Sequence, residues 1–152
     1  MRVGVGYDSH RFAAGRPLVL GGVEIEHDRG LEGHSDADVV AHAVIDALLG
    51  AAGLGDLGTH FPPDEERWRD ADSIDMLRTV LGLLAGPVRN VDVSVIAEEP
   101  RLGPHREEME RNLSAALAAP VSVKASSNEG MGFVGRGEGI ACIAVALLDM
   151  SE

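Results

Sequence analysis

The apolar run from Ile140 to Leu148 limits the fold of this chain more than any other feature. Its residues are apolar on both faces of an extended strand, so both faces have to be covered by other structure. The segment with Val91, Val93 and Val95 differs, because polar residues alternate with the valines and predict a half-buried strand. Together these strands indicate a layered fold, and they are compatible with an oligomer whose sheets pack together.

Apolar periodicity, capping residues and glycines predict strands and helices along the rest of the chain. Ser35 is predicted to cap the first helix, and Asp38 completes a capping box three residues later. The order of elements predicts one mixed α/β domain over residues 1–152, with helices on one face of a mixed sheet. The predicted strands are 2–7, 18–25 with a bend at Gly21-Gly22, 91–95, 121–126 and 140–148; the predicted helices run from Ser35 to Gly50 or Gly53, from Asp72 or Ser73 to Gly86-Pro87, and from Pro104 to Pro120; a glycine-rich loop spans 130–139.

The formal net charge of −12 on 152 residues repels nucleic acid and anionic membrane surfaces. No apolar stretch reaches the ~20 residues that a membrane-spanning helix needs. The first residues lack the basic and then apolar order of a signal peptide, so we expect a cytoplasmic protein. The single cysteine, Cys142, lies in the last apolar run, where we expect a small buried side chain rather than a nucleophile.

Asp8 and His10 suggest a metal site. Residues two apart in a strand point to the same side, roughly 6.5–7 Å from each other, at the point where the first strand is predicted to end. A further imidazole would complete three ligands that zinc accepts and leave a fourth position open. His42 lies in the first predicted helix beside its apolar stripe, and either completes this trio or bonds a neighbouring carbonyl. Asp46, one turn further on, is expected to orient His42.

His34 and Ser35 lie at the predicted start of the same helix. Free N–H groups and the helix dipole make such a position a natural seat for a phosphate, to which His34 could donate a hydrogen bond. The alternative is that Ser35 only caps the helix and His34 is an ordinary loop residue.

Two further segments follow predicted strands. Ser126-Ser127-Asn128-Glu129 places hydroxyls and a carboxylate before a glycine-rich loop, where they could bind phosphate oxygens and a hard cation such as magnesium. The loop is neither a P-loop nor a dinucleotide fingerprint, and an ordinary hairpin is the alternative. Residues 97–103 could contact a base edge or simply turn into the third helix.

These motifs, taken in order, resemble the 2-C-methyl-D-erythritol 2,4-cyclodiphosphate synthase family over the whole chain. The resemblance rests on separated motifs in family order and at family spacing. They are Gly6–His10, His34–Asp38, Asp46–Gly50, Gly55–Gly58 with Phe61-Pro62, Asn90–Val93, Gly132-Phe133 and Gly135–Ala141.

The resemblance implies a phosphorus–oxygen lyase of non-mevalonate isoprenoid biosynthesis. In that reaction the 2-phosphate of 4-diphosphocytidyl-2-C-methyl-D-erythritol 2-phosphate attacks the β-phosphorus, which releases CMP and closes 2-C-methyl-D-erythritol 2,4-cyclodiphosphate. The resemblance also implies Zn²⁺ or another divalent ion on Asp8, His10 and His42, and Mg²⁺ or Mn²⁺ near Glu129. His34 and Ser127 match the family positions that stabilise the transition state.

The same resemblance implies the residues that bind the nucleotide-linked substrate. Asp56 would hold the ribose hydroxyls, and residues 97–103 would wrap the cytosine. The full expected set is Asp8, His10, His34, Ser35, Asp56, Leu57, Gly58, Phe61, Pro62, Pro63, Asp64, Glu65, Ala97, Glu98, Glu99, Pro100, Arg101, Leu102, Gly103, Ser126, Ser127, Asn128, Glu129, Phe133 and Arg136.

The resemblance further implies a homotrimer, with sheets packed around its axis and active sites between subunits. Phe133 and Arg136 match residues that line an axial cavity, which in relatives holds an isoprenoid diphosphate. Asn128 departs from the family, which usually has a hydroxyl there, and Arg101 stands where lysine is common.

Two other functions remain open from the sequence. A zinc-dependent nucleotide phosphohydrolase would use the same three ligands with water in the open position. A nucleotide or isoprenoid sensor without catalysis would not need the metal trio, His34 and Ser127 together.

Overall fold

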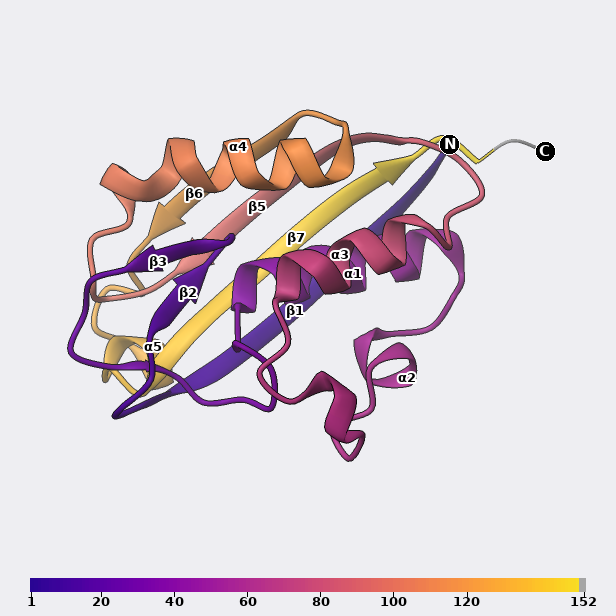
Figure 1. The fold of residues 1–152 in the computed structure, drawn as a ribbon. Coiled ribbons are helices and arrows are strands. Elements are labelled where there is room, and N and C mark those ends of the chain that lie inside the picture. Colours follow the sequence, from indigo (N-terminus) through magenta and orange to yellow (C-terminus); the bar gives the residue numbers. More distant parts are fainter. Residues whose placement is uncertain (151–152) are drawn as a thin grey trace.

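The fold is built on a five-stranded mixed sheet, as a computed structural model of residues 1–150 shows (Figure 1). The strand order is β4-β1-β7-β5-β6, and only the pair β5–β6 is parallel. A separate hairpin, β2–β3, precedes the first helix. The strands are β1 (Arg2–Ala13), β2 (Leu18–Leu20), β3 (Val23–Ile25), β4 (Gly30–Leu31), β5 (Val88–Ile96), β6 (Val121–Ser126) and β7 (Gly139–Leu148).

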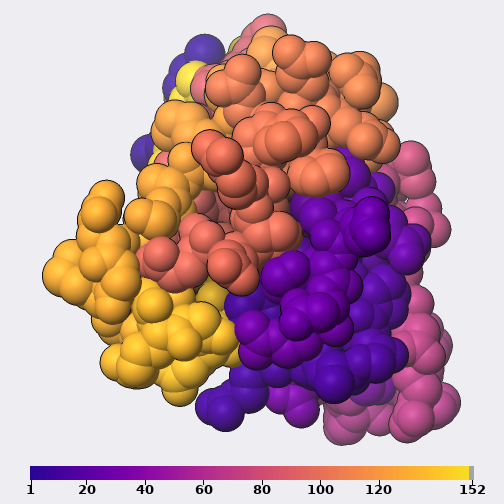
Figure 2. All heavy atoms as spheres, turned by 90° about the vertical axis from the view of Figure 1, so that its left-hand side faces the viewer, coloured from indigo at the N-terminus to yellow at the C-terminus, as the bar shows by residue number. Residues whose placement is uncertain are grey.

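The long helices lie on one side of this sheet (Figure 1). Helix α1 packs on β1 and β7, α3 packs on α1, and α4 packs on β6. The β2–β3 hairpin lies against α4, as the violet and orange surfaces of Figure 2 show. The mixed α/β architecture predicted from the sequence is confirmed. The helices are α1 (Val39–Ala52), α2 (Leu57–His60), α3 (Ser73–Leu81), α4 (Arg106–Leu117) and α5 (Gly132–Gly135), with 3₁₀ turns η1 (Glu66–Trp68) and η2 (Gly103–His105).

Several predicted boundaries were wrong. Strand β1 continues to Ala13, because it pairs with β7 as far as Arg11 and then with β4. Helix α3 ends at Leu81, several residues before Gly86. The 3₁₀ turn η2 precedes α4, and the short helix α5 interrupts the predicted glycine-rich loop.

The predicted cap of the first helix was also wrong, because Asp38 and not Ser35 caps α1. The fully buried Asp38 carboxylate accepts hydrogen bonds from the amides of Val40 and Ala41, and from those of Gly21 and Gly22 in the hairpin turn. Burial raises the pKa of Asp38 to about 6, although the four amides favour its charged form. One side chain therefore fixes both the start of α1 and the position of the β2–β3 turn.

Helix α1 approaches β1 unusually closely over Gly4 and Gly6. A Cβ atom at Gly6 would lie 1.9 Å from the Ala43 carbonyl oxygen, and one at Gly4 would lie 2.0 Å from that of Ala47. Asp8 follows on the same face of β1, since alternate residues of a strand share a face. The two glycines thus bring the start of α1, with His42, down onto Asp8.

The opposite face of the sheet is apolar and exposed in the single chain. Tyr7 is paired with Ile143 and Val5 with Val145, and these four side chains are 41–67% exposed. The prediction that both faces of the last strand are covered therefore does not hold within one chain, because the long helices α1, α3 and α4 lie on the other side of the sheet.

We predict that Gly6→Ala destabilises the fold by about 1–3 kcal/mol, because the added methyl group has to push α1 away from β1. Urea denaturation followed by circular dichroism measures this change. Gly50→Ala is the control: a Cβ there would meet only the Val5 carbonyl oxygen, at 4.0 Å, and the change should stabilise α1 by roughly 0.5–1 kcal/mol. Equal stability of Gly6→Ala and the parent chain would contradict the close packing.

Candidate functional site

Strand β1 and helix α1 bring Asp8, His10 and His42 together as the sequence predicted. His10 Nε2 lies 2.8 Å from Asp8 Oδ2, His42 Nδ1 lies 3.1 Å from the same oxygen, and the two nitrogens are 3.2 Å apart. Ligand atoms around a tetrahedral zinc ion lie roughly 3.3 Å apart, given bonds of about 2.0–2.1 Å. The three atoms therefore fit a small divalent cation with little movement.

Hydrogen bonds orient both imidazoles of this trio. His10 Nδ1 donates to the Glu32 carbonyl at 2.8 Å, which leaves Nε2 for the cation. His42 Nε2 lies 2.9 Å from Ser73 Oγ and 3.2 Å from Ser35 Oγ. Asp46 does not orient His42 as predicted, because its carboxylate accepts from the Leu57 amide. The sequence did not indicate that Ser73 contacts His42. Ser73 is distant in the chain and was considered only as a possible start of the second long helix.

Charge within the trio favours an ionised Asp8. Burial by itself raises the pKa of Asp8, but hydrogen bonds from His10 and His42 outweigh it and lower the pKa to about 2. Burial lowers the pKa of His10, but its hydrogen bond to Asp8 and the Asp8 charge outweigh this and raise the pKa above the usual value for histidine. The trio thus has a permanent anion and an imidazole that holds its proton tightly when no cation is bound.

The free helix amides expected beside His34 and Ser35 are not present there, because the predicted start of the first helix was wrong. The helix begins at Val39, so His34 lies in the preceding loop rather than on the helix. The Asp38 carboxylate already occupies the amides of Val40 and Ala41. The buried Ser35 hydroxyl accepts from the Ala37 amide and lies 3.2 Å from His42 Nε2, so Ser35 contacts the trio. Its contact with the substrate stays a prediction.

A cavity of about 250 Å³ opens beside the trio. Asp8 and His42 line it together with Asp46 and with Asp56, Leu57 and Gly58 at the start of α2. The last three residues are among the predicted substrate contacts. Phe61 is instead buried, with its ring edge against Trp68, and Glu65 pairs with Arg67. The segment Phe61, Pro62, Pro63, Asp64 and Glu65 does not line this cavity.

The segments 97–104, without Glu99, and 125–127 line a second cavity, of about 550 Å³. Strand register explains why they meet, since Ile96 at the end of β5 is paired with Ser126 at the end of the parallel strand β6. Figure 2 shows this region, where the coral and light-orange segments adjoin. The segment 97–103 and the hydroxyl segment at Ser126 and Ser127, which the sequence singled out separately, therefore line one cavity.

Glu98 shapes the edge of this second cavity. Its carboxylate accepts from the amides of Asn128 and Gly130, at 2.8 and 3.2 Å, on either side of Glu129. Glu129 has a φ of 54°, a left-handed conformation that is uncommon for a residue with a side chain. Ser127 Oγ accepts from the Glu129 amide, which leaves the Ser127 proton available to a ligand. Glu98 thus holds Glu129 in place.

The two cavities lie at the same end of the sheet. Ser126, Ile96, Ala141 and Ser9 form one row across β6, β5, β7 and β1. Three strand spacings separate the ends of this row by about 14 Å. The cavities share no lining residue, so in a single chain the trio and the segment 97–103 line separate pockets.

Phe133 and Arg136 separate in the structure. Phe133 lines a small cavity of about 210 Å³ beside Ser9, His10 and Arg11. Arg136 is exposed and pairs with Glu138 at 2.8 Å, outside the lining of that cavity.

Comparison with known proteins identifies the family. The YgbB family model matches residues 1–149. A 2-C-methyl-D-erythritol 2,4-cyclodiphosphate synthase of Symbiobacterium thermophilum is 59% identical over 97% of this chain and 98% of its own. A solved 2C-methyl-D-erythritol-2,4-cyclodiphosphate synthase with bound CDP has a TM-score of 0.89 at 36% identity, covering 97% of this chain and all of that one.

The bifunctional IspDF of Campylobacter jejuni has a TM-score of 0.93 at 37% identity, and the match covers 99% of this chain and 42% of that longer one. These proteins define a class of α/β enzymes that form cyclic diphosphates. The chain belongs to the YgbB family, that of the 2-C-methyl-D-erythritol 2,4-cyclodiphosphate synthases. Within residues 1–150, no helix is both long enough and apolar enough to span a bilayer.

We predict that divalent metal affinity rises from about pH 5 to pH 8, because a cation has to displace the tightly held proton of His10. Asp8 stays ionised over this range, so His10 dominates the slope. Isothermal titration calorimetry with Zn²⁺ at several pH values measures the effect, and His105→Gln controls for histidines outside the trio. An affinity independent of pH would contradict this assignment of ligands.

Proposed function

We propose that this chain converts 4-diphosphocytidyl-2-C-methyl-D-erythritol 2-phosphate to 2-C-methyl-D-erythritol 2,4-cyclodiphosphate with release of CMP. The observation that carries the proposal is the trio, whose three ligand atoms lie 2.8–3.2 Å apart beside an open cavity. The 59% identity to a synthase over nearly the full length of both chains supports the same activity.

The trio would hold Zn²⁺ or a similar divalent ion, and Glu129 would hold Mg²⁺ or Mn²⁺. When bound, these ions supply positive charge that offsets the repulsion between phosphate groups. Two nitrogens and one carboxylate oxygen suit zinc, whereas the exposed carboxylate of Glu129 suits a harder ion.

The residues of the chain bind and orient the substrate, which supplies its own nucleophile. Asp56, Leu57 and Gly58 would contact the sugar in the cavity beside the trio. Residues 97–103 would bind the cytosine through backbone groups, in the cavity that they share with Ser126 and Ser127. Holding the 2-phosphate in line with the β-phosphorus replaces a bimolecular encounter by an oriented one, which is a large part of the rate enhancement.

His34 and Ser127 would donate hydrogen bonds to the phosphate oxygens, with Asn128 and Arg101 nearby. The hydroxyl of Ser127 has a proton available for this role, since its oxygen accepts from the Glu129 amide. A protein of this activity works on water-soluble phosphorylated compounds, which fits a cytoplasmic location.

A homotrimer would complete the site. The trio and the cytosine loop line separate cavities in one chain, and the exposed strip of Val5, Tyr7, Ile143 and Val145 offers an apolar surface for packing sheets together. In such an assembly one subunit supplies the trio and its neighbour supplies the cytosine loop. Phe133 and Arg136 would face the axis, where an isoprenoid diphosphate could bind.

Phosphorus NMR of the reaction products tests this function. We expect CMP and a cyclic diphosphate from the wild-type chain, and no turnover together with loss of bound zinc in His42→Ala, because two ligands hold the cation too weakly. His105→Gln is the matched control and should keep both. Open-chain phosphates would instead favour a zinc-dependent phosphohydrolase, and an active, zinc-free His42→Ala would remove the metal from the proposal.

A further inference from the structure

His42 Nε2, the ring nitrogen that faces away from Asp8, is connected to the Asp36 carboxylate through the Ser73 hydroxyl. Ser73 Oγ lies 2.9 Å from His42 Nε2, and the same hydroxyl hydrogen-bonds Asp36 Oδ1. Asp36 Oδ2 also accepts from the Ser73 amide at 3.0 Å. Ser73 is fully buried and His42 is only 6% exposed, so water has little access to this chain of bonds.

The direction of each proton follows from the chemistry of the groups. A carboxylate only accepts, so the Ser73 hydroxyl donates to Asp36 and its oxygen has to accept from His42 Nε2–H. An imidazole with its proton on Nε2 has its lone pair on Nδ1. That nitrogen lies 3.1 Å from Asp8 Oδ2, to which it can donate a proton only while no cation is bound. When a cation is bound to Nδ1, the proton that His42 keeps is the one on Nε2, which faces Ser73.

Ser35 is the second hydroxyl near His42 Nε2, but it does not impose a direction in the same way. Its oxygen lies farther away, at 3.2 Å, and accepts from the Ala37 amide at 3.3 Å. The proton of Ser35 can therefore point toward Nε2 or away from it. A proton donated by Ser35 to Nε2 would move the imidazole proton to Nδ1 and block that ligand position.

We propose that Ser73 and Asp36 are positioning residues, which hold His42 in the tautomer that keeps Nδ1 free for a divalent cation. The inference rests on the proposed role of His42 as a metal ligand. It extends the common arrangement in which a carboxylate fixes a metal-binding histidine, here with a serine in between.

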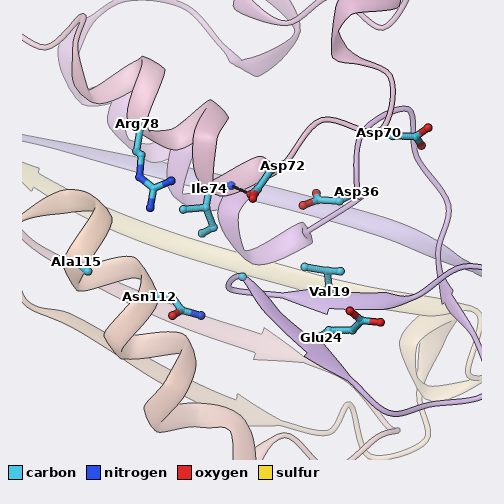
Figure 3. A pocket seen from close by; sticks show the side chains of 10 residues that line it. Val19, Glu24, Asp36, Asp70, Asp72, Ile74, Arg78, Asn112 and Ala115 are labelled. Carbon is cyan, nitrogen blue, oxygen red and sulfur yellow. Dashed lines mark hydrogen bonds between the residues drawn. The ribbon is translucent and has the colours of Figure 1, made fainter.

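Further hydrogen bonds hold Asp36 in place, and with it the relay of hydrogen bonds from Asp36 through Ser73 to His42. The Asp36 amide donates to the Ala71 carbonyl, and its carboxylate also accepts from the Asp38 amide. Asp36 lies on the wall of a cavity of about 460 Å³, opposite the hairpin residues Val19 and Glu24 (Figure 3). Asp72 lines the same cavity, but its carboxylate caps α3 through the Ile74 amide.

Two measurements that do not depend on turnover test the relay. The first is the Zn²⁺ dissociation constant of the purified protein, from competition with a chromophoric chelator. The second is the tautomer of His42 in the Zn²⁺-loaded protein, from ¹⁵N chemical shifts of its ring nitrogens. For Ser73→Ala we expect a loss of about 10–100-fold in Zn²⁺ affinity and a mixture of tautomers in place of the Nε2–H form.

Two further variants separate positioning from folding. Ser73→Thr keeps the hydroxyl and should restore the tautomer and most of the affinity. Asp36→Asn should weaken Zn²⁺ binding, since an amide can donate to Ser73 and reverse the direction of the hydrogen bonds. Asp72→Asn is the matched control: it alters the cap of α3 on the same cavity wall and should leave both readouts unchanged.

Unchanged affinity and an unchanged tautomer in Ser73→Ala would overturn the relay, and so would equal losses in Asp36→Asn and Asp72→Asn. The proposed function fails separately, if the wild-type chain binds Zn²⁺ with His42 in the Nε2–H form but makes no cyclic product. A wild-type chain that takes no Zn²⁺ would overturn both.

Discussion

The close contact between strand β1 and helix α1 is the constraint on which the site depends. Gly4 and Gly6 leave room for the carbonyl groups of α1, so the helix lies directly on the strand. Asp8 lies two residues after Gly6 on the same face of β1, and there it contacts His42. A side chain at either glycine would separate the two elements, and the three ligand atoms would no longer lie within one coordination sphere.

Polar contacts around the start of α1 complete what this packing begins. Asp38 caps the helix and holds the hairpin turn, while Asp36 and Ser73 connect the preceding loop to α3. All of these groups are buried or half-buried, where an unpaired polar atom is costly. The resulting network leaves His42 little freedom to turn, which suits a ligand that has to meet a cation at one nitrogen.

The arrangement of the second cavity follows from strand register. Parallel pairing of β5 and β6 makes the loops after both strands leave at the same edge, so residues 97–104 meet Ser126 and Ser127. Antiparallel pairing of β7 with both β1 and β5 places that edge at the end of the sheet that carries His10. The trio and the segment 97–104 therefore share one end of the sheet, although one chain keeps them in separate cavities.

The sequence by itself determined the long helices and the mixed α/β class, because periodicity and residue type are local properties. It left His42 open between a metal ligand and a partner of a carbonyl group, and the trio followed only from the resemblance to the family. It placed the cap of α1 wrongly, since Ser35 and Asp38 are equally good caps in isolation and only the hairpin amides of Gly21 and Gly22 favour Asp38. Ser73 as the partner of His42, and Asp46 as the partner of Leu57, were decided by tertiary structure alone. Those contacts join residues far apart in the chain, and no local pattern records which distant hydroxyl or amide a buried side chain will meet.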